Sequence, residues 1–249
     1  MGGAIAREGS NRMKKKEVCA MIEKIGIIPA IRSSSAEDAH FAAEAVSKGG
    51  IPIVEITMTV PNAIEVISHL VRFHPQMIVG AGTVMDEETA RQCVGAGATF
   101  LTSSGFRLAI VEFAAKQDIA VLPGALTPTE IVTAWEAGSD LVKVFPCSQV
   151  GGESYIKSVK TALPEIPLVA AGGVNQLTAA NFILSGACAI GVGAELIPPE
   201  AIERRQGERI RELAFRFTEF VKEAREKVAA GKKRASRKKH LDIEHCEAQ

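Results

Sequence analysis

The sequence has no excess of charge of either sign and no long hydrophobic run. Its 29 Lys and Arg residues balance 29 Asp and Glu residues, so the formal net charge is zero. A neutral chain gives no electrostatic reason to expect a nucleic acid or an anionic membrane as a partner. No apolar run approaches the roughly 18 residues of a membrane-spanning helix, and the start lacks the apolar middle of a signal peptide. We therefore expect a cytoplasmic protein.

Cysteine and histidine are scarce and follow no pattern. The five cysteines contain no Cys-x-x-Cys pair, and an odd, scattered count suits reduced thiols better than a disulfide framework. The five histidines show no ligand-like spacing at the ends of the predicted strands, so we expect no metal. Cys147 follows a predicted strand, and we interpret it as a small packing residue because no histidine is placed to activate it.

Both ends of the chain differ in composition from the middle. We interpret residues 1–13 as a disordered extension. Residues 229–249 turn from an amphipathic pattern to a basic run and then to an acidic tip. Such a charge block is typical of a solvated, disordered tail, and contact with a nucleic acid or a membrane surface is the alternative. No linker interrupts the remainder, so residues 14–228 are predicted to form one domain.

Short β-branched runs alternate with helix-period stretches through this domain. Eight such runs, spaced by roughly 20 to 25 residues as a βα unit requires, begin at Gly26, Ile51, Met77, Thr99, Ile119, Leu141, Pro167 and Cys188. The stretches between them carry helix caps, such as the serines and the closing glycines of residues 33–50. Alternation predicts a parallel sheet covered by helices, and eight units favour a closed (β/α)8 TIM barrel.

The first run ends in "RSSS" rather than in Gly-x-Gly-x-x-Gly, so a dinucleotide-binding fold is not expected. A helix precedes the first strand and a long helix follows the last one. We interpret both as caps of the barrel.

Chemistry in such barrels gathers at the carboxyl ends of the strands. The polar or flexible residues at these ends are Arg32, Glu55, Thr57, Thr59, Thr83, Ser103, Ser104, Pro123, Gly124, Lys143, Gly172, Gly173, Gly191 and Gly193.

Two of these residues are charged although they lie within apolar strands. Lys143 lies in "LVKVFP" and Glu55 in "IVEIT". Burial disfavours a charged amine, and a neutral amine attacks carbonyls, so Lys143 is a candidate for Schiff-base formation. A lysine paired with a buried carboxylate for stability is the alternative, but a buried ion pair is a costly route to stability. A Lys–Glu couple that moves protons around an imine needs both groups out of bulk water.

Glycine pairs follow the last two strands, in "AGGVNQ" and "GVGAE". At this place many barrels hold a phosphate or another anion with backbone N–H groups. The alternative is that the glycines only allow tight βα turns.

The segments "VEITMTVPNA", "VGAGTV", "LPGALTPTE", "LVKVFP" and "AAGGV" occur in the same order, over about residues 14–225, as in one known family. The chain resembles the 2-keto-3-deoxy-6-phosphogluconate (KDPG) / 4-hydroxy-2-oxoglutarate (KHG) aldolases. The resemblance implies a homotrimeric TIM barrel that needs no metal and no cofactor. It implies a class I aldolase that cleaves a 2-keto-3-deoxy sugar acid phosphate or KHG to pyruvate and glyceraldehyde 3-phosphate or glyoxylate.

The resemblance also implies roles for single residues. Lys143 would form the Schiff base, Glu55 would shuttle protons, and Thr83 would hold the pyruvyl carboxylate. Gly172 and Gly173 would form the anion loop. Further substrate-binding candidates at the strand ends are Thr59, Pro123, Gly124 and Gly193.

Three positions depart from the family pattern. Thr59 stands where many members have an arginine that contacts the pyruvyl carboxylate, and we expect Arg32 to supply that charge instead. Ala171 and Ala194 replace two hydroxyl residues, and Glu195 would repel an anion if it faced the pocket. Two hydroxyl donors to phosphate are therefore missing, which favours a non-phosphorylated acid such as KHG.

Two other functions remain open on the residues alone. One is a phosphosugar isomerase or epimerase that uses Glu55 as a carbon-acid base and forms no imine. The other is a non-catalytic barrel that serves as a scaffold and recruits a partner through its basic tail. Inactivation by borohydride in the presence of pyruvate separates the aldolase from both.

Overall fold

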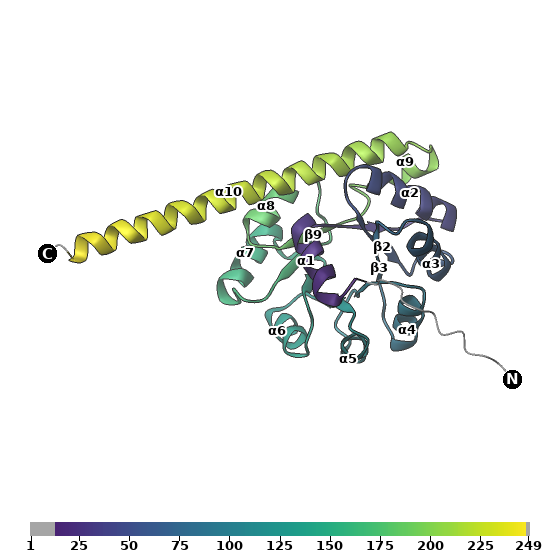
Figure 1. The fold of residues 1–249 in the computed structure, drawn as a ribbon, viewed down its shortest axis with the longest axis horizontal. Coiled ribbons are helices and arrows are strands. Elements are labelled where there is room, and N and C mark those ends of the chain that lie inside the picture. The colour runs from purple at the N-terminus through teal and green to yellow at the C-terminus, as the bar shows by residue number, and fades with distance from the viewer. Residues whose placement is uncertain (1–12, 248–249) are drawn as a thin grey trace.

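The computed structural model describes residues 13–247, which form a nearly closed barrel of parallel strands ringed by helices (Figure 1). The strand order around the barrel is β5-β4-β3-β2-β1-β9-β8-β7-β6. The strands are β1 (Ile27–Ile31), β2 (Ile53–Thr57), β3 (Ile78–Gly82), β4 (Phe100–Thr102), β5 (Ala120–Leu122), β6 (Gly124–Ala125), β7 (Val142–Val144), β8 (Leu168–Ala171) and β9 (Ala189–Val192). The predicted TIM-barrel architecture is confirmed.

The structure has nine strands where the sequence predicts eight, because the fifth predicted strand is divided at Pro123. Proline has no N–H to donate to a β-ladder, so the ladder is interrupted there. β5 pairs with β4, whereas β6 pairs with β7. The Pro123 carbonyl accepts a hydrogen bond of 2.9 Å from the Lys143 N–H. The barrel is thus closed by one continuous stretch of chain that changes partner at a proline.

The helices alternate with the strands, and one 3-10 turn, η1 (Cys147–Val150), follows β7. The helices are α1 (Lys15–Ile25), α2 (Ala36–Lys48), α3 (Ala63–Phe73), α4 (Glu87–Gly95), α5 (Leu108–Lys116), α6 (Pro128–Glu136), α7 (Gly152–Ala162), α8 (Ala179–Leu184), α9 (Pro199–Glu203) and α10 (Gly207–Glu247). No helix within residues 13–247 is both long enough and apolar enough to cross a bilayer.

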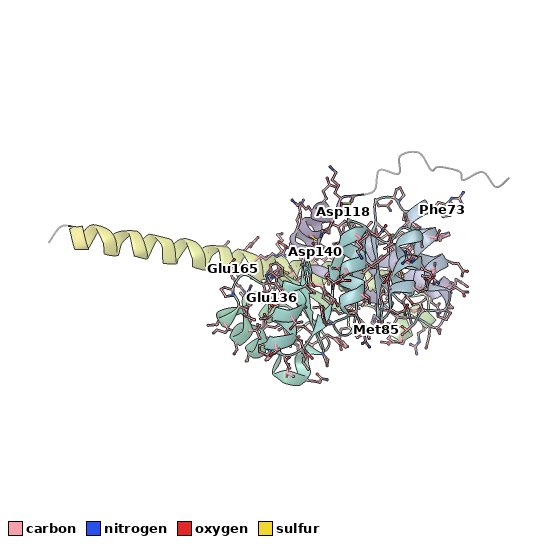
Figure 2. The ribbon with its side chains drawn as sticks, turned by 90° about the horizontal axis from the view of Figure 1, so that it is seen from below. Phe73, Met85, Asp118, Glu136, Asp140 and Glu165 are labelled. Atoms are coloured by element: carbon pink, nitrogen blue, oxygen red, sulfur yellow. The ribbon has the colours of Figure 1, made fainter. Side chains whose placement is uncertain are left out.

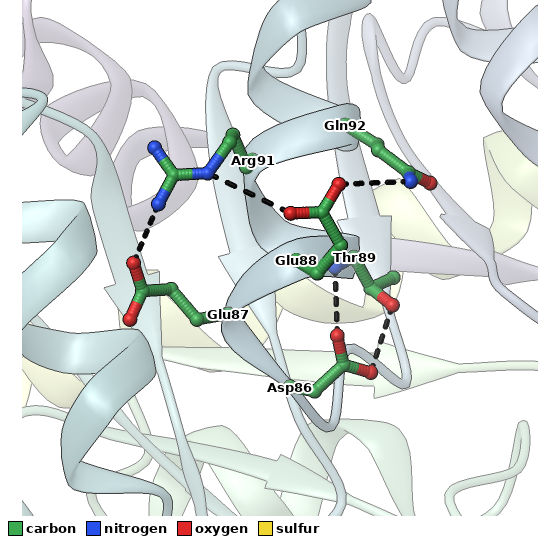
Figure 3. A network of polar contacts seen from close by, with 6 residues as sticks. All are labelled: Asp86, Glu87, Glu88, Thr89, Arg91 and Gln92. Carbon is green, nitrogen blue, oxygen red and sulfur yellow. Dashed lines mark hydrogen bonds and ion pairs between the residues drawn. The ribbon is translucent and has the colours of Figure 1, made fainter.

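The start of α4 shows how the sequence fixes a helix at the carboxyl ends of the barrel strands (Figure 3). The Asp86 carboxylate accepts hydrogen bonds from the Thr89 N–H (2.7 Å) and the Thr89 hydroxyl (2.8 Å), which lowers the pKa of Asp86. This is the N-cap arrangement that satisfies the unpaired N–H groups of a first turn. Glu87, the first residue of α4, forms a 2.7 Å ion pair with Arg91, which lies one helical turn further along. The cap holds the loop between β3 and α4, which carries Thr83.

The two helices interpreted as caps differ in position. α1 lies over the barrel in Figure 1 and contacts β1, β5 and β9, so its interpretation as a cap agrees with the structure. Lys15 of α1 pairs at 3.1 Å with Asp140, labelled in Figure 2, and Asp140 also accepts a 3.0 Å hydrogen bond from the Val121 N–H.

The cap interpretation is wrong for α10, which packs along the outer side of α2 and α8. These are the helices that follow β1 and β8, so α10 completes the helical ring beside β9. α10 continues as one helix to Glu247, through most of residues 229–249, for which the sequence predicts disorder. The domain boundaries stay a prediction, and residues 1–12 of the predicted extension lie outside the described residues.

Arg225 attaches α10 to the barrel. Its guanidinium donates hydrogen bonds to the carbonyls of Glu23 and Lys24, at the end of α1, and to the Cys188 carbonyl at 3.0 Å. Burial lowers the pKa of this guanidinium. Carbonyls at a helix end need such partners when they are withdrawn from water.

Arg225→Ala is expected to lower the free energy of unfolding by about 2–3 kcal/mol, because hydrogen bonds to a charged donor are lost and three carbonyls lose their partner. Denaturant unfolding of the purified chain measures this loss. The matched control is Arg211→Ala, which removes an exposed pair with Glu208 and is expected to cost less than about 1 kcal/mol. Equal losses in the two variants would contradict the anchoring role of Arg225.

His40 of α2 is stacked on His69 of α3, with ring centroids 4.3 Å apart, and its buried Nε2 has no hydrogen-bond partner within the described residues. Burial, and then the neighbouring His69, lower the pKa of His40, while Glu44 opposes them. The unfolded chain therefore binds more protons below about pH 6.5, the ordinary pKa of histidine, and folding stability falls as the pH drops through that value.

A drop from about pH 7.5 to about pH 5.5 is expected to lower the melting temperature of the native chain by a few °C more than that of His40→Phe, since about 1 kcal/mol shifts Tm by roughly 2–4 °C at this size. His40→Phe keeps a stacked ring but cannot be protonated. Scanning calorimetry at the two pH values measures the difference. An identical drop in both proteins would show that His40 contributes nothing to the pH dependence.

Candidate active site

Lys143 points into the barrel from the middle of β7. Its neighbours Val142 and Val144 are fully buried on the opposite face, toward the helices, and alternation along a strand turns Lys143 inward. The side chain is 8% exposed as a residue, so the amine is largely withdrawn from water. Its Nζ lies 5.6 Å from the centroid of the Phe145 ring, at the end of the strand.

Three side chains from different strands meet inside the barrel. Nζ of Lys143 lies 3.7 Å from Oε2 of Glu55 on β2. The Thr102 hydroxyl on β4 donates a 2.8 Å hydrogen bond to the same Glu55 oxygen and accepts one of 3.3 Å from Lys143. Glu55 is 2% and Thr102 1% exposed. The amine and the carboxylate are therefore joined through a hydroxyl and also lie within ion-pair distance.

Glu55 keeps one oxygen available for chemistry. Its Oε1 is buried and has no hydrogen-bond partner among the described residues, whereas buried polar atoms are usually bonded. A Cβ on Gly82 would stand 2.0 Å from this oxygen, so the glycine at the end of β3 leaves the space that the carboxylate occupies. A purely structural ion pair would be expected to satisfy both oxygens, and this arrangement instead favours a proton acceptor.

A cavity of about 220 Å³ opens directly beside Lys143 and Glu55. Six of the predicted site residues line it: Arg32, Glu55, Lys143, Gly172, Gly173 and Gly193. The volume is below the roughly 300–1,000 Å³ of pockets for larger ligands, so it suits a small acid. Thr59, Thr83, Pro123 and Gly124 do not line the cavity in the described part of the chain.

Arg32 brings a positive charge to this cavity from the end of β1. A Cβ on Gly193 would lie 3.4 Å from Nη1 of Arg32, so Gly193 gives the guanidinium room. Among the side chains that the structure describes, those of residues 13–231, no acidic one forms an ion pair with Arg32. Its charge is therefore available to a ligand, as the sequence predicts, while its contact with a carboxylate stays a prediction.

The two threonine candidates lie in loops that the barrel holds in place. Thr83 follows β3 with a φ of 60°, a left-handed conformation that is unusual for a β-branched residue and is often found at functional sites. The Thr59 hydroxyl lies 2.7 Å from the Thr57 hydroxyl, which donates to the Ile31 carbonyl at 3.0 Å. The Thr59 hydroxyl is thus already hydrogen-bonded to Thr57. A role of Thr59 or Thr83 in substrate binding stays a prediction.

Pro123 and Gly124 have a clear role in barrel closure. A Cβ on Gly124 would stand 2.4 Å from the Ser104 carbonyl carbon, and the Gly124 N–H donates to the Ser103 hydroxyl at 3.3 Å. Only a glycine allows this close approach of two strand ends. Their predicted contact with substrate stays untested.

The glycine loop after β8 both turns and faces the cavity. Gly172 and Gly173 have φ values of 86° and 82°, and a Cβ on Gly173 would stand 2.0 Å from the Ser148 hydroxyl oxygen. That hydroxyl donates a 2.8 Å hydrogen bond to the Gly172 carbonyl. Tight packing therefore requires these glycines, and both of them line the cavity.

The sequence interpretation missed Thr102. The run "TFLTSS" was identified as a strand, and its period of two places Thr102 on the same face as Phe100, which fills the barrel interior. A buried threonine on that face, near a predicted Lys–Glu couple, was the available signal.

Cys147 lies next to the site but is unsuited to nucleophilic chemistry. Burial raises the pKa of its thiol to about 12, so it stays protonated at neutral pH. No group of three or more His, Cys, Asp and Glu side chains in the described part of the chain is arranged to hold a metal ion.

Known proteins share this arrangement of elements. The 2-dehydro-3-deoxy-6-phosphogalactonate aldolase of Escherichia coli K12 is 30% identical over 207 residues, which is 82% of this chain and 97% of the relative. The 2-dehydro-3-deoxy-phosphogluconate aldolase of Pseudomonas aeruginosa is 28% identical over 211 residues, covering 83% and 96%. A crystal structure of KDPG aldolase from Legionella pneumophila, with pyruvate captured as a covalent carbinolamine intermediate, superposes with a TM-score of 0.74. That structure is 29% identical over 80% of this chain and 96% of its own.

A sequence model of the family described as KDPG and KHG aldolase matches residues 18–213, well over half of the chain. A buried lysine joined to a glutamate inside a parallel barrel, beside a small cavity, accompanies this match. The chain belongs to the KDPG/KHG aldolase family.

Proposed function

We propose that the chain cleaves a 2-keto-3-deoxy acid to pyruvate and an aldehyde through an imine on Lys143. The observation that carries this proposal is the Lys143–Thr102–Glu55 cluster on the wall of the cavity. The relatives named as aldolases support it, and so does the carbinolamine captured in the Legionella enzyme. A class I aldolase is a carbon–carbon lyase that needs no metal, since the imine withdraws the electrons.

The first half of the reaction builds the imine. Lys143 gives a proton to Glu55, which lies 3.7 Å away, and the neutral amine attacks the C2 ketone of the substrate. Glu55 then returns a proton to the carbinolamine hydroxyl, which leaves as water. Oε2 of Glu55 is the oxygen near Nζ, and the hydrogen bond from the Thr102 hydroxyl to it holds the carboxylate in place for the proton transfers.

The second half breaks the carbon–carbon bond. The protonated imine accepts the electron pair of the C3–C4 bond while Glu55 takes the proton of the C4 hydroxyl, and the aldehyde leaves. The resulting enamine is protonated at C3, water attacks the imine carbon, and pyruvate is released with the amine restored. Arg32, which lines the cavity, pairs with the substrate carboxylate and fixes the imine relative to the base.

Pyruvate release from a panel of 2-keto-3-deoxy acids tests the function. We expect release from at least one acid, and loss of activity on borohydride treatment with pyruvate present. Release without borohydride inactivation would favour an imine-free enzyme. Failure to bind pyruvate would favour a scaffold.

The assembly state belongs to the same proposal. The resemblance supports a homotrimer, so light scattering of the purified chain is expected to give about three times its mass of 26.4 kDa. A single-chain mass would contradict the trimer without affecting the imine chemistry.

A further inference from the structure

The cavity is lined by equal numbers of positively and negatively charged side chains. Lys143 and Arg32 are cationic, while Glu55 and Glu195 are anionic. Lys143 and Glu55 lie 3.7 Å apart, so their charges neutralise each other, and both groups take part in forming the imine. Arg32 is therefore the one cation of the lining, within the described residues, that remains for a charge on the substrate. Every 2-keto acid already carries one carboxylate.

Glu195 brings a negative charge to the same wall of the cavity as Arg32. It follows β9, whose strand pairs with β1 in register Pro29–Val192, and Arg32 comes directly after β1. Glu195 is exposed and forms no ion pair with the described side chains, which are those of residues 13–231. An unpaired carboxylate in a partly enclosed cavity repels a second anion more strongly than it would in open solvent.

The glycine loop after β8, the strand that pairs with β9, does not offset that repulsion. Neither Gly173 nor Val174 has an acceptor for its N–H within the described residues, so both N–H groups are available to a ligand. Such groups carry no formal charge, and they can donate to hydroxyl and carbonyl oxygens as well as to phosphate oxygens. The following helix, α8, begins only at Ala179 and has six residues, so its dipole adds little at the cavity. Ala171 and Ala194, also in the lining, contribute no hydroxyl.

We infer that Glu195 makes this cavity selective for 2-keto-3-deoxy acids whose tail is an uncharged polyol, against tails that end in phosphate or carboxylate. Tail hydroxyls donate to the Glu195 carboxylate and accept from the N–H groups of Gly173 and Val174. The inference rests on the proposed aldolase function and names its substrate class.

The test compares three acids with the full chain: 2-keto-3-deoxygluconate, its 6-phosphate, and KHG. We expect kcat/KM for pyruvate release to be at least about tenfold higher for the uncharged tail than for either charged tail, equivalent to about 1.4 kcal/mol. Glu195→Gln is expected to raise kcat/KM for the two charged tails by about five- to tenfold. It is expected to lower kcat/KM for the uncharged tail by about two- to threefold, because a neutral amide oxygen accepts hydrogen bonds from the tail hydroxyls less strongly than a carboxylate. The control is Glu165→Gln, an equal change of charge at a residue that precedes β8, whereas Glu195 follows β9. This control is expected to change none of the three.

Borohydride trapping with pyruvate alone separates the tail preference from the aldolase function, because pyruvate has no tail. The adduct on Lys143 is expected in the native chain and in both variants. A native preference for a charged tail would overturn the inference, and so would an unchanged preference in Glu195→Gln, while the adduct would still uphold the aldolase. Absence of the adduct from the native chain would overturn both.

Discussion

Lys143→Ala is expected to lower kcat/KM for pyruvate release by on the order of 10⁵-fold, since removal of a covalent nucleophile costs nearly the whole chemical acceleration. The substitution deletes the amine that forms the imine and places no bulk in the cavity beside it. No other lysine lines that cavity in the described part of the chain. Pyruvate release, followed with a coupled assay, measures the effect. Mass analysis after borohydride treatment with pyruvate is expected to find no adduct.

Two controls separate chemistry from stability. Lys157→Ala removes an exposed lysine of α7 and is expected to keep both activity and the adduct on Lys143. Lys143→Arg retains a cation for Glu55 but cannot form an imine, so it is expected to stay folded and inactive. If Lys143 served only as a structural ion-pair partner, the arginine variant would be active. A borohydride adduct persisting in Lys143→Ala would assign the imine to another residue.

Much of the site could be predicted from the sequence because its chemistry lies on strands. Side chains of a strand in a parallel barrel point alternately into the barrel and toward the surrounding helices. The positions of the lysine and the glutamate within their apolar runs therefore indicate that both point into the barrel. Their positions on β7 and β2 follow from that pattern, and the structure brings them to 3.7 Å. Arg32, at the end of β1, follows from the same reasoning about strand ends.

Contacts between distant elements could not be predicted in this way. The pattern marks α10 as a long amphipathic helix but does not say that it fills the ring between α2 and α8, since that depends on the short lengths of α8 and α9. The left-handed conformation of Thr83, in the loop between β3 and the Asp86 cap of α4, has no marker in the hydrophobic pattern. Thr102 carries no charge to mark it, and its role appears only when β2, β4 and β7 are seen together.

Glu55→Gln is expected to lower kcat by about 10²- to 10⁴-fold, the usual contribution of general acid–base catalysis. The amide keeps the length of the side chain and can still accept the hydrogen bond from the Thr102 hydroxyl. It cannot take a proton from Lys143 or from the C4 hydroxyl of the substrate. The rates of imine formation and of C3–C4 cleavage are therefore both expected to fall, although the amine nucleophile is still present. Steady-state pyruvate release measures kcat, and the rate of borohydride trapping with pyruvate measures imine formation alone.

The trapping readout distinguishes a proton-transfer role of Glu55 from a structural one. With Glu55→Gln the adduct on Lys143 is expected to form slowly but to completion, because the nucleophile is intact. The matched control, Glu112→Gln on the exposed face of α5, is expected to change neither rate. A kcat within about twofold of the native value would exclude Glu55 as the base. Loss of the adduct together with the fold would instead mean that the buried carboxylate serves mainly to stabilise the Lys143 charge, since an unpaired buried charge is strongly destabilising.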